Sequence, residues 1–349
     1  MKPISIGDFQ IGRGLAPFVI AEMSGNHGQS LEKAYKLIDA AAEAGAHAIK
    51  FQTYTPDTIT LDCHEGEFFI EDPNSLWKGN SLYNLYKEAM TPWEWHKELF
   101  DYAKEKGLMA FSTPFDLTAV DFLETLNPPC YKVASFENTD HAILAAVAKT
   151  GKPVIVSTGM ASQAEIAESV DVLKNNGCRD LILLKCTSNY PANPVDANLK
   201  TIPHLSELFD CQVGLSDHTP GVGVAVAAVA LGATVVEKHF VLDRTGGEVD
   251  AEFSLEPHEL RLLVEETARA AVAIGGVSYG ATEREKASLV HRRSLYIAED
   301  LKAGDTLNDE NLRSVRPGLG LPPKYLPLLL GKKINKDAAK GTPMSWELL

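Results

Sequence analysis

The chain has 349 residues, of which 45% are apolar and 23% are charged, a balance that supports a full hydrophobic core and excludes disordered, collagen-like and disulfide-scaffold proteins. Lysine and arginine number 33 against 47 acidic residues, so the net charge is -14, which disfavours nucleic acid and anionic membranes as partners. This length suits two domains, or one large barrel with an appendage.

The cysteines and the N-terminal residues indicate the cellular compartment of the protein. The five cysteines are widely spaced and include no Cys-x-x-Cys pair, so neither a disulfide framework nor a zinc knuckle is expected. Residues 1–10 lack the basic patch and apolar run of a signal peptide, and the near-apolar stretch 222–236 is short and broken by glycine, unlike a membrane span. These features predict a cytoplasmic protein with free thiols.

Short apolar or β-branched runs recur along the first 245 residues, and amphipathic stretches such as 31–44, 92–106 and 163–176 separate them. This alternation predicts eight strand–helix units, that is, a (β/α)₈ TIM barrel over residues 1–284. Ser162 followed by Glu165 predicts a capping box at the start of one helix. The expected strands are 18–23, 48–54, 109–115, 131–135, 153–159, 181–188, 212–219 and 234–242.

The interval between the second and third expected strands is about twice as long as the others and therefore holds an insertion. It is rich in aromatic residues, and two interpretations stay open. The insertion is either a lid over a site at the barrel mouth or a structural excursion with its own small core. The aromatic residues are Phe68, Phe69, Trp77, Tyr83 and Tyr86.

The C-terminal part of the chain differs in character. After an expected helix over 257–274, glycines and the charged run 283–286 indicate a linker. Residues 285–349 combine a strand-like piece at 294–298 with several turn signals, which predicts a small loop-rich module. A module of this size rarely holds a large core, so it is expected to lean on the barrel or on a second subunit.

The carboxyl ends of the strands carry polar residues throughout, and in a (β/α)₈ barrel these ends converge on one mouth, where catalytic groups lie. The sequence therefore predicts an ionisable site at the mouth. In chain order the residues are Glu22; Lys50 and Gln52; Thr113; Lys132, Ser135 and Glu137; Ser157; Lys185, Thr187, Ser188 and Tyr190; Ser216, Asp217 and His218; and Glu237, Lys238 and His239.

Four lysines lie among these strand ends, and a buried lysine needs a carboxylate partner or an anionic ligand. Strand alternation prevents all four from facing inward, and Lys238 is expected to point into the helix layer. The remaining lysines, Lys50, Lys132 and Lys185, together with the serine and threonine hydroxyls, suit a ligand with a phosphate and a carboxylate.

His218 and His239 end adjacent expected strands, so both imidazoles could bind one divalent ion, with water or substrate in the other positions. The alternative is that each histidine is a hydrogen-bonded polar residue. The segment 246–257 follows with Asp250 and Glu252, which could bind sugar hydroxyl or amide groups. The alternative for this segment is a solvated loop.

Six runs, in chain order, resemble motifs of the nonulosonic (sialic) acid synthases: IAEMSGNH at 20–27, IKFQ at 49–52, STPF at 112–115, STGM at 157–160, GLSDHT at 214–219 and EKHF at 237–240. The resemblance covers essentially the whole chain, and residues 285–349 resemble the small antifreeze-like (SAF) domain of that family. It implies an enzyme that condenses phosphoenolpyruvate with a sugar aldehyde, releasing phosphate and giving a nine-carbon 2-keto acid.

The resemblance also implies roles for individual residues. His218 and His239 match ligands of a divalent metal ion, Mn²⁺ or Mg²⁺. Arg316 matches an arginine that the antifreeze-like domain extends across a homodimer to the partner's sugar site. Positions around the reacting centre and the sugar are Glu22, Gln52, Glu137, Tyr190 and Asp250, and positions that hold the substrates are Lys50, Thr113, Lys132, Ser135, Ser157, Ser188 and Ser216.

Three stretches resemble the pseudaminate branch of this family more than its N-acetylneuraminate branch. Residues 250–257 lack the His-Lys pair that follows the aspartate in the N-acetylneuraminate branch, and Ser188 stands where that branch has asparagine. Residues 82–96 also resemble the pseudaminate branch. The implied acceptor is 2,4-diacetamido-2,4,6-trideoxy-L-altrose, whose deoxy methyl group would suit Phe253. N-acetylneuraminate or legionaminate synthesis by the same chemistry is the alternative.

The expected mechanism joins the methylene of phosphoenolpyruvate to an aldehyde that a metal polarises, and Glu22 or Glu137 assists the attack of water. Two other classes stay open. A Schiff-base aldolase would use one mouth lysine and no metal, and a sugar-binding or ice-binding protein would have no turnover.

Overall fold

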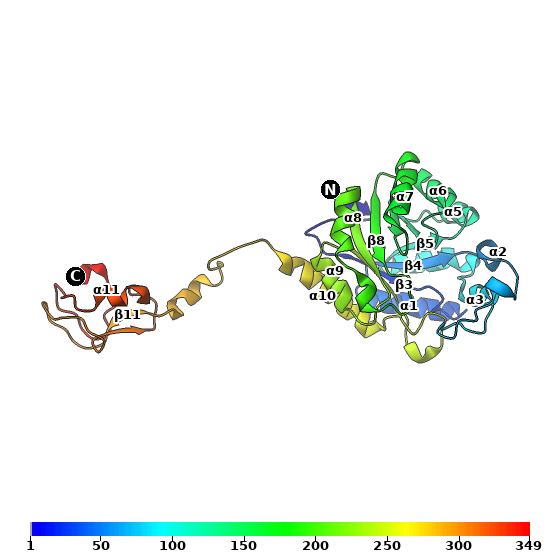
Figure 1. Ribbon diagram of the computed structural model, residues 1–349. Coiled ribbons are helices and arrows are strands. Elements are labelled where there is room, and N and C mark those ends of the chain that lie inside the picture. Colours follow the sequence, from blue (N-terminus) through cyan, green and yellow to red (C-terminus); the bar gives the residue numbers. More distant parts are fainter. Residues whose placement is uncertain (1) are drawn as a thin grey trace. The chain divides into compact units, whose positions relative to one another are not determined.

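The computed structural model describes residues 2–349, which form two compact units that divide after Gly275 (Figure 1). The division comes before the expected boundary between residues 284 and 285. The segment that follows Gly275 is highly exposed, since Val277 and Tyr279 are 92% and 95% accessible to solvent. The two units are described separately.

The first unit is a barrel of eight parallel strands, which confirms the fold predicted from the sequence. The strands are hydrogen-bonded in the order β5-β4-β3-β10-β9-β8-β7-β6, and the two end strands, β5 and β6, also lie against each other, so the barrel is nearly closed. The strands are β3 (Phe18–Glu22), β4 (Ala48–Thr53), β5 (Met109–Pro114), β6 (Tyr131–Val133), β7 (Val154–Ser157), β8 (Leu181–Cys186), β9 (Gln212–Asp217) and β10 (Val235–His239).

Helices follow the strands and surround them (Figure 1). Several begin at capping residues, because a short polar side chain can accept hydrogen bonds from the free N–H groups of the first turn. Ser162 and Glu165 form the predicted capping box. The helices are α1 (Leu31–Glu43), α4 (His96–Glu105), α5 (Leu117–Glu124), α6 (His141–Lys149), α7 (Gln163–Asn175), α8 (Thr201–Phe209), α9 (Gly223–Ala230) and α10 (Pro257–Ile274).

A short antiparallel hairpin, β1 (Ile4–Ile6) and β2 (Phe9–Ile11), precedes the barrel and was not predicted. Its three isoleucines, Ile4, Ile6 and Ile11, pack with inward-facing apolar residues of the strands in one buried cluster. The hairpin therefore closes the barrel at the amino ends of the strands, and the open mouth is at the carboxyl ends.

The insertion between β4 and β5 contains α2 (Pro56–Ile59) and α3 (Leu82–Ala89) with short 3₁₀ turns around them. Two of its aromatic residues, Trp77 and Tyr86, line the cavity at the barrel mouth. This position supports the lid hypothesis. The Trp77 indole also donates a hydrogen bond to the Val249 carbonyl at 2.9 Å, which joins the insertion to the loop after β10.

The second unit, Gly276–Leu349, contains one antiparallel pair, β11 (Ser294–Ile297) and β12 (Leu312–Val315), and the short helix α11 (Leu326–Leu329). It has a hydrophobic cluster of its own, which includes Leu295, Ile297 and Leu312. The expectation that this module leans on the barrel or on a second subunit stays a prediction. No helix within residues 2–349 is long and apolar enough to cross a membrane.

Candidate active site

The inward-facing residues of the barrel change from apolar to ionisable toward the mouth. The lower layer, next to the hairpin, includes Ile20, Ala48, Phe111, Cys130, Ile155, Leu184 and Val235. Because side chains alternate along a strand, the residues two positions further along face the same interior. These are Glu22, Lys50, Thr113, Lys132, Ser157, Cys186 and Glu237, all of them buried.

This ionisable layer forms the inner end of a cavity of about 510 Å³ at the mouth. Cavities of this size hold small-molecule ligands. Strand ends, the insertion and the loop after β10 all contribute to its walls. The cavity brings together most of the predicted site residues: Glu22, Lys50, Gln52, Lys132, Ser135, Glu137, Ser157, Ser188, Tyr190, Ser216, His218, His239 and Asp250.

Two lysines and two carboxylates form a buried network at the inner end. Lys50 forms an ion pair with Glu22, lies 3.8 Å from Glu237, and donates a hydrogen bond to the Thr113 hydroxyl at 3.1 Å. Lys132 lies 3.7 Å from the same Glu237. Thr113 therefore supports Lys50 from behind rather than lining the cavity.

Burial and charge oppose each other in this network. Burial disfavours charge on Lys50 and on Glu237, but the opposite charges around them prevail, so the pKa of Lys50 is raised and that of Glu237 is lowered. Burial prevails at Lys132 and lowers its pKa. An anionic ligand that met Lys132 would raise this pKa again, because it would favour the charged form.

Hydroxyl groups line the cavity beside Lys132. The Ser135 and Ser188 hydroxyls are 2.7 Å apart, and the Ser157 hydroxyl is buried with no hydrogen-bond partner within residues 2–349. Gly159 has a φ of +51°, and a Cβ there would lie 2.4 Å from the Cβ of Ser135 and 2.8 Å from the Ser188 hydroxyl. Glycine at this position is thus what allows the two serines to approach. The group offers several donors to an anion.

The two histidines lie together, with ring centroids 5.3 Å apart. Nδ1 of His218 faces the Thr187 carbonyl at 3.0 Å, whereas Nδ1 of His239 is buried and has no hydrogen-bond partner among the described residues. Burial and the neighbouring His218 hold the pKa of His239 well below its usual value. A neutral imidazole with an unused nitrogen is a suitable metal ligand, so the residues present fit a divalent ion.

Asp250 closes the site from the loop after β10. Its carboxylate accepts a hydrogen bond from the Ser24 hydroxyl and lies 3.9 Å from Nδ1 of His239. Gln52 donates to both Glu22 and Ser24 at 3.0 Å, which links the lysine network to this aspartate. Glu252, named with Asp250 in the sequence, does not line this cavity.

Lysines on the outer side of strands do not join the site. Lys238 points away from the cavity, as predicted, and pairs with Asp217 at 2.9 Å. Lys185 was expected in the anion cradle, and this was wrong, because Leu184 and Cys186 on either side of it face inward. Its ammonium group binds the Cys186 carbonyl and the Thr187 hydroxyl instead.

Two residues of the site were not predicted as functional, Ser24 and Cys186. Both line the cavity, as does Glu237, which the sequence named at a strand end without a role. Burial alone would raise the pKa of the Cys186 thiol, but the contact with His218 lowers it to about 7. Strand alternation could have found Cys186, since it lies two positions after Leu184, which faces inward.

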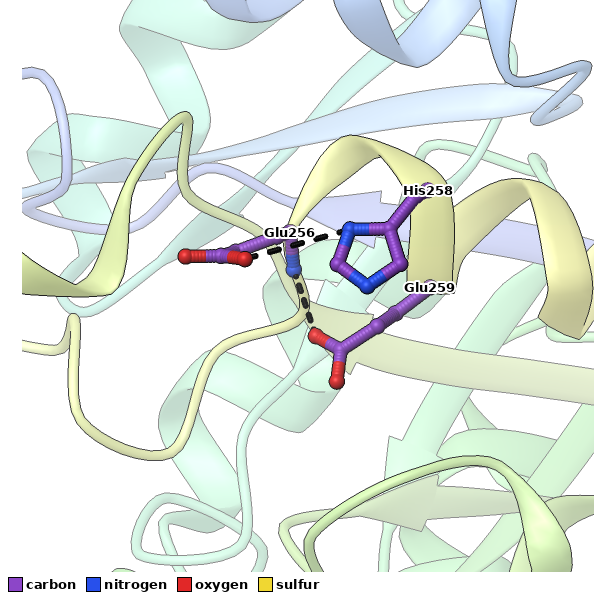
Figure 2. A group of neighbouring side chains, drawn as sticks. All are labelled: Glu256, His258 and Glu259. Atoms are coloured by element: carbon purple, nitrogen blue, oxygen red, sulfur yellow. Dashed lines mark hydrogen bonds and ion pairs between the residues drawn. The ribbon is translucent and has the colours of Figure 1, made fainter.

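A second group of potential metal ligands lies outside the cavity, where α10 begins (Figure 2). Within residues 2–349 it is the one group of three such side chains whose ligand atoms converge: Glu256, His258 and Glu259. Arg244 pairs with both carboxylates, and the two glutamates form a capping box with the backbone of α10. Because these carboxylates already have partners, we interpret the group as the N-terminal cap of α10, stabilised by Arg244.

Comparison with known proteins places this barrel and its site in one class. The chain belongs to the NeuB family, whose model matches residues 37–279, and an SAF domain model matches residues 292–349. It is 44% identical to the pseudaminic acid synthase of Campylobacter jejuni subsp. jejuni serotype O:2, over 97% of each chain. It is 38% identical to the pseudaminic acid synthase of Helicobacter pylori, over 94% of this chain and 96% of that one.

A solved structure resembles the fold closely. The N-acetylneuraminic acid (sialic acid) synthetase of Leptospira borgpetersenii serovar Hardjo-bovis, crystallised with citrate, superposes with a TM-score of 0.72 at 34% identity. The match covers 82% of this chain and 95% of that one. The predicted resemblance to the nonulosonic (sialic) acid synthases is confirmed.

Proposed function

We propose that this protein condenses phosphoenolpyruvate with 2,4-diacetamido-2,4,6-trideoxy-L-altrose and water, giving pseudaminic acid and phosphate. The observation that carries the proposal is the buried Lys50–Lys132 network beside two convergent histidines. Relatives named pseudaminic acid synthase match nearly the whole chain. N-acetylneuraminate or legionaminate synthesis would use the same chemistry on a different acceptor.

Phosphoenolpyruvate would bind at the inner end of the cavity. Lys50 and Lys132 supply charge, and the hydroxyls of Ser135, Ser157, Ser188 and Ser216 supply hydrogen bonds. The Ser216 hydroxyl donates a hydrogen bond to Glu237 at 3.1 Å. Thr113 keeps Lys50 in place through its hydrogen bond.

His218 and His239 would hold the divalent ion, Mn²⁺ or Mg²⁺, beside this anion site. When bound, the ion supplies Lewis-acid polarisation of the acceptor's aldehyde oxygen. Asp250, Gln52 and Tyr190 would orient the acceptor around that aldehyde. Asp250 lies 3.9 Å from His239, the Tyr190 ring packs on His218 with centroids 4.5 Å apart, and Gln52 is linked to Asp250 through Ser24.

We propose different roles for the two candidate carboxylates, Glu22 and Glu137. Both have a pKa raised to about 7 by burial. The oxygens of Glu22 are engaged by Lys50 and Gln52, so Glu22 acts as the counter-ion of Lys50. Among the described residues no cation pairs with Glu137, and its Oε2 atom is buried without a partner. We assign to Glu137 the role of general base. Its carboxylate accepts a proton from the water that attacks C2 of the former phosphoenolpyruvate, after which phosphate leaves.

A phosphate-release assay tests the proposed function. With phosphoenolpyruvate, the diacetamido sugar and Mn²⁺, we expect one phosphate for each 2-keto acid formed. Lys132→Met should raise the KM for phosphoenolpyruvate by about 100-fold, since a charged hydrogen bond is lost from a buried site. If no acceptor sugar leads to phosphate release, the proposal is contradicted. Borohydride trapping of a lysine adduct would favour the Schiff-base aldolase.

Arg316 and the homodimer belong to the same proposal. Arg316 lies in the second unit, where its side chain is exposed, and within residues 2–349 its guanidinium has no hydrogen bond or ion pair. We propose that it reaches the sugar site of the partner subunit. The five free cysteines suit a cytoplasmic location.

Arg316→Ala should raise the KM for the acceptor about tenfold while leaving the KM for phosphoenolpyruvate unchanged, because one charged hydrogen bond to the sugar is lost. Mixing this variant with Lys132→Met should restore activity at low acceptor concentration, since mixed dimers contain one intact site. Arg313→Ala, an exposed arginine on the same unit, is the matched control. Absence of rescue would argue against shared sites.

A further inference from the structure

The insertion contributes only apolar and aromatic side chains to the cavity. We call five of them the insertion wall: Ile59, Ile70, Trp77, Leu82 and Leu85. The insertion also contributes Ala89 and Tyr86; the Tyr86 phenol, whose pKa is raised by burial and by the Glu137 carboxylate, is counted with the ionisable end and not with this wall. The strand ends contribute lysines, carboxylates, hydroxyls and imidazoles. The cavity is thus divided into an ionisable inner end and an apolar side that faces the insertion.

The insertion wall offers no free hydrogen-bonding group to a ligand. Four of its side chains are aliphatic, and the indole N–H of Trp77 is already bound to the Val249 carbonyl at 2.9 Å. A sugar hydroxyl placed against this wall would lose its hydrogen bonds to water and gain none in return. A methyl group placed there would gain apolar contact.

The orientation of the acceptor follows from its reaction. Its aldehyde carbon must lie beside the histidines and the anion site, so the far end of the carbon chain, C6, extends toward the loops and the insertion. Phe253 is packed on His239, with ring centroids 4.9 Å apart, and on Tyr190 at 5.1 Å. Phe253 therefore lies at the reacting end and is poorly placed to contact C6.

We propose that the insertion wall selects acceptors whose C6 carries no hydroxyl, so that it is the specificity determinant for 6-deoxy acetamido sugars. This inference rests on the proposed function and extends it. It assigns to the insertion the discrimination that the sequence had suggested for Phe253.

The test compares two acceptors that differ only at C6, 2,4-diacetamido-2,4,6-trideoxyhexose and its 6-hydroxy counterpart. Wild type should prefer the deoxy sugar by about 10- to 100-fold in kcat/KM. Ile70→Asn and Leu82→Asn should each reduce this ratio about tenfold, because both side chains are half-buried and line the cavity. The KM for phosphoenolpyruvate should not change.

Leu76→Asn is the matched control, since Leu76 lies on the same insertion but does not line this cavity. It should keep the wild-type ratio. A wild-type ratio near one, with phosphate released from both sugars, would overturn the inference and leave the proposed function intact. Unchanged ratios in active Ile70→Asn and Leu82→Asn would also overturn it. No phosphate from either sugar would overturn the proposed function itself, and the inference with it.

Discussion

His239→Ala should lower kcat by about 10³-fold at saturating substrates. The imidazole lies 5.3 Å from that of His218, centroid to centroid, and its Nδ1 atom has no hydrogen-bond partner among residues 2–349, the Asp250 carboxylate lying 3.9 Å away. Removing it therefore breaks no hydrogen bond at that atom and leaves the fold in place, but removes one of two predicted metal ligands. Loss of Lewis-acid polarisation costs several kcal/mol of transition-state stabilisation. Phosphate release measures the fall in kcat, and calorimetric titration with Mn²⁺ measures the loss of metal affinity.

His258→Ala is the control for this prediction. His258 is exposed beside Glu256 and Glu259, the surface group that resembles a metal site by proximity alone (Figure 2). We expect unchanged activity and unchanged Mn²⁺ affinity. If His258→Ala lost the metal while His239→Ala retained it, the ion site would be on the surface and the assignment to the cavity would be wrong.

The period-two alternation of strands explains how much of the site the sequence predicted. Once Lys50 and Ser157 are taken as inward-facing, the alternation fixes Ile155 and Ala48 below them, and the structure has this arrangement. The same rule applied strictly to β8 would have placed Cys186 inside and Lys185 outside. The error at Lys185 came from giving charge more weight than register.

Contacts between distant segments could not be predicted in this way. Asp250 is held by Ser24, and Val249 by Trp77, across more than 150 positions of sequence in each case. Loop residues have no periodicity that would fix their direction. The N-terminal hairpin was missed because three-residue strands such as Ile4–Ile6 are too short for alternation to stand out.

Glu137→Gln should lower kcat by about 10²- to 10³-fold and change the shape of the pH profile, because it removes the group assigned to the water proton. Burial raises the pKa of Glu137 to about 7, so only the deprotonated form above that pH can accept a proton. In wild type, kcat should therefore rise as the pH passes through about 7. In the variant, this rise should disappear from the rate measured between pH 5.5 and 8.5.

Stability supplies an independent readout of the same carboxyl group. A carboxyl whose pKa is higher in the folded than in the unfolded chain favours folding below its unfolded pKa, and this contribution is lost as the pH rises through the folded value. Glu137→Gln, which stays neutral, should therefore have a higher Tm than wild type at pH 8 and a similar Tm near pH 4.5. A variant that keeps the pH-dependent rise in kcat, with no gain in Tm at pH 8, would move the proton-transfer role from Glu137 to Glu22, the other buried carboxyl whose pKa lies near 7.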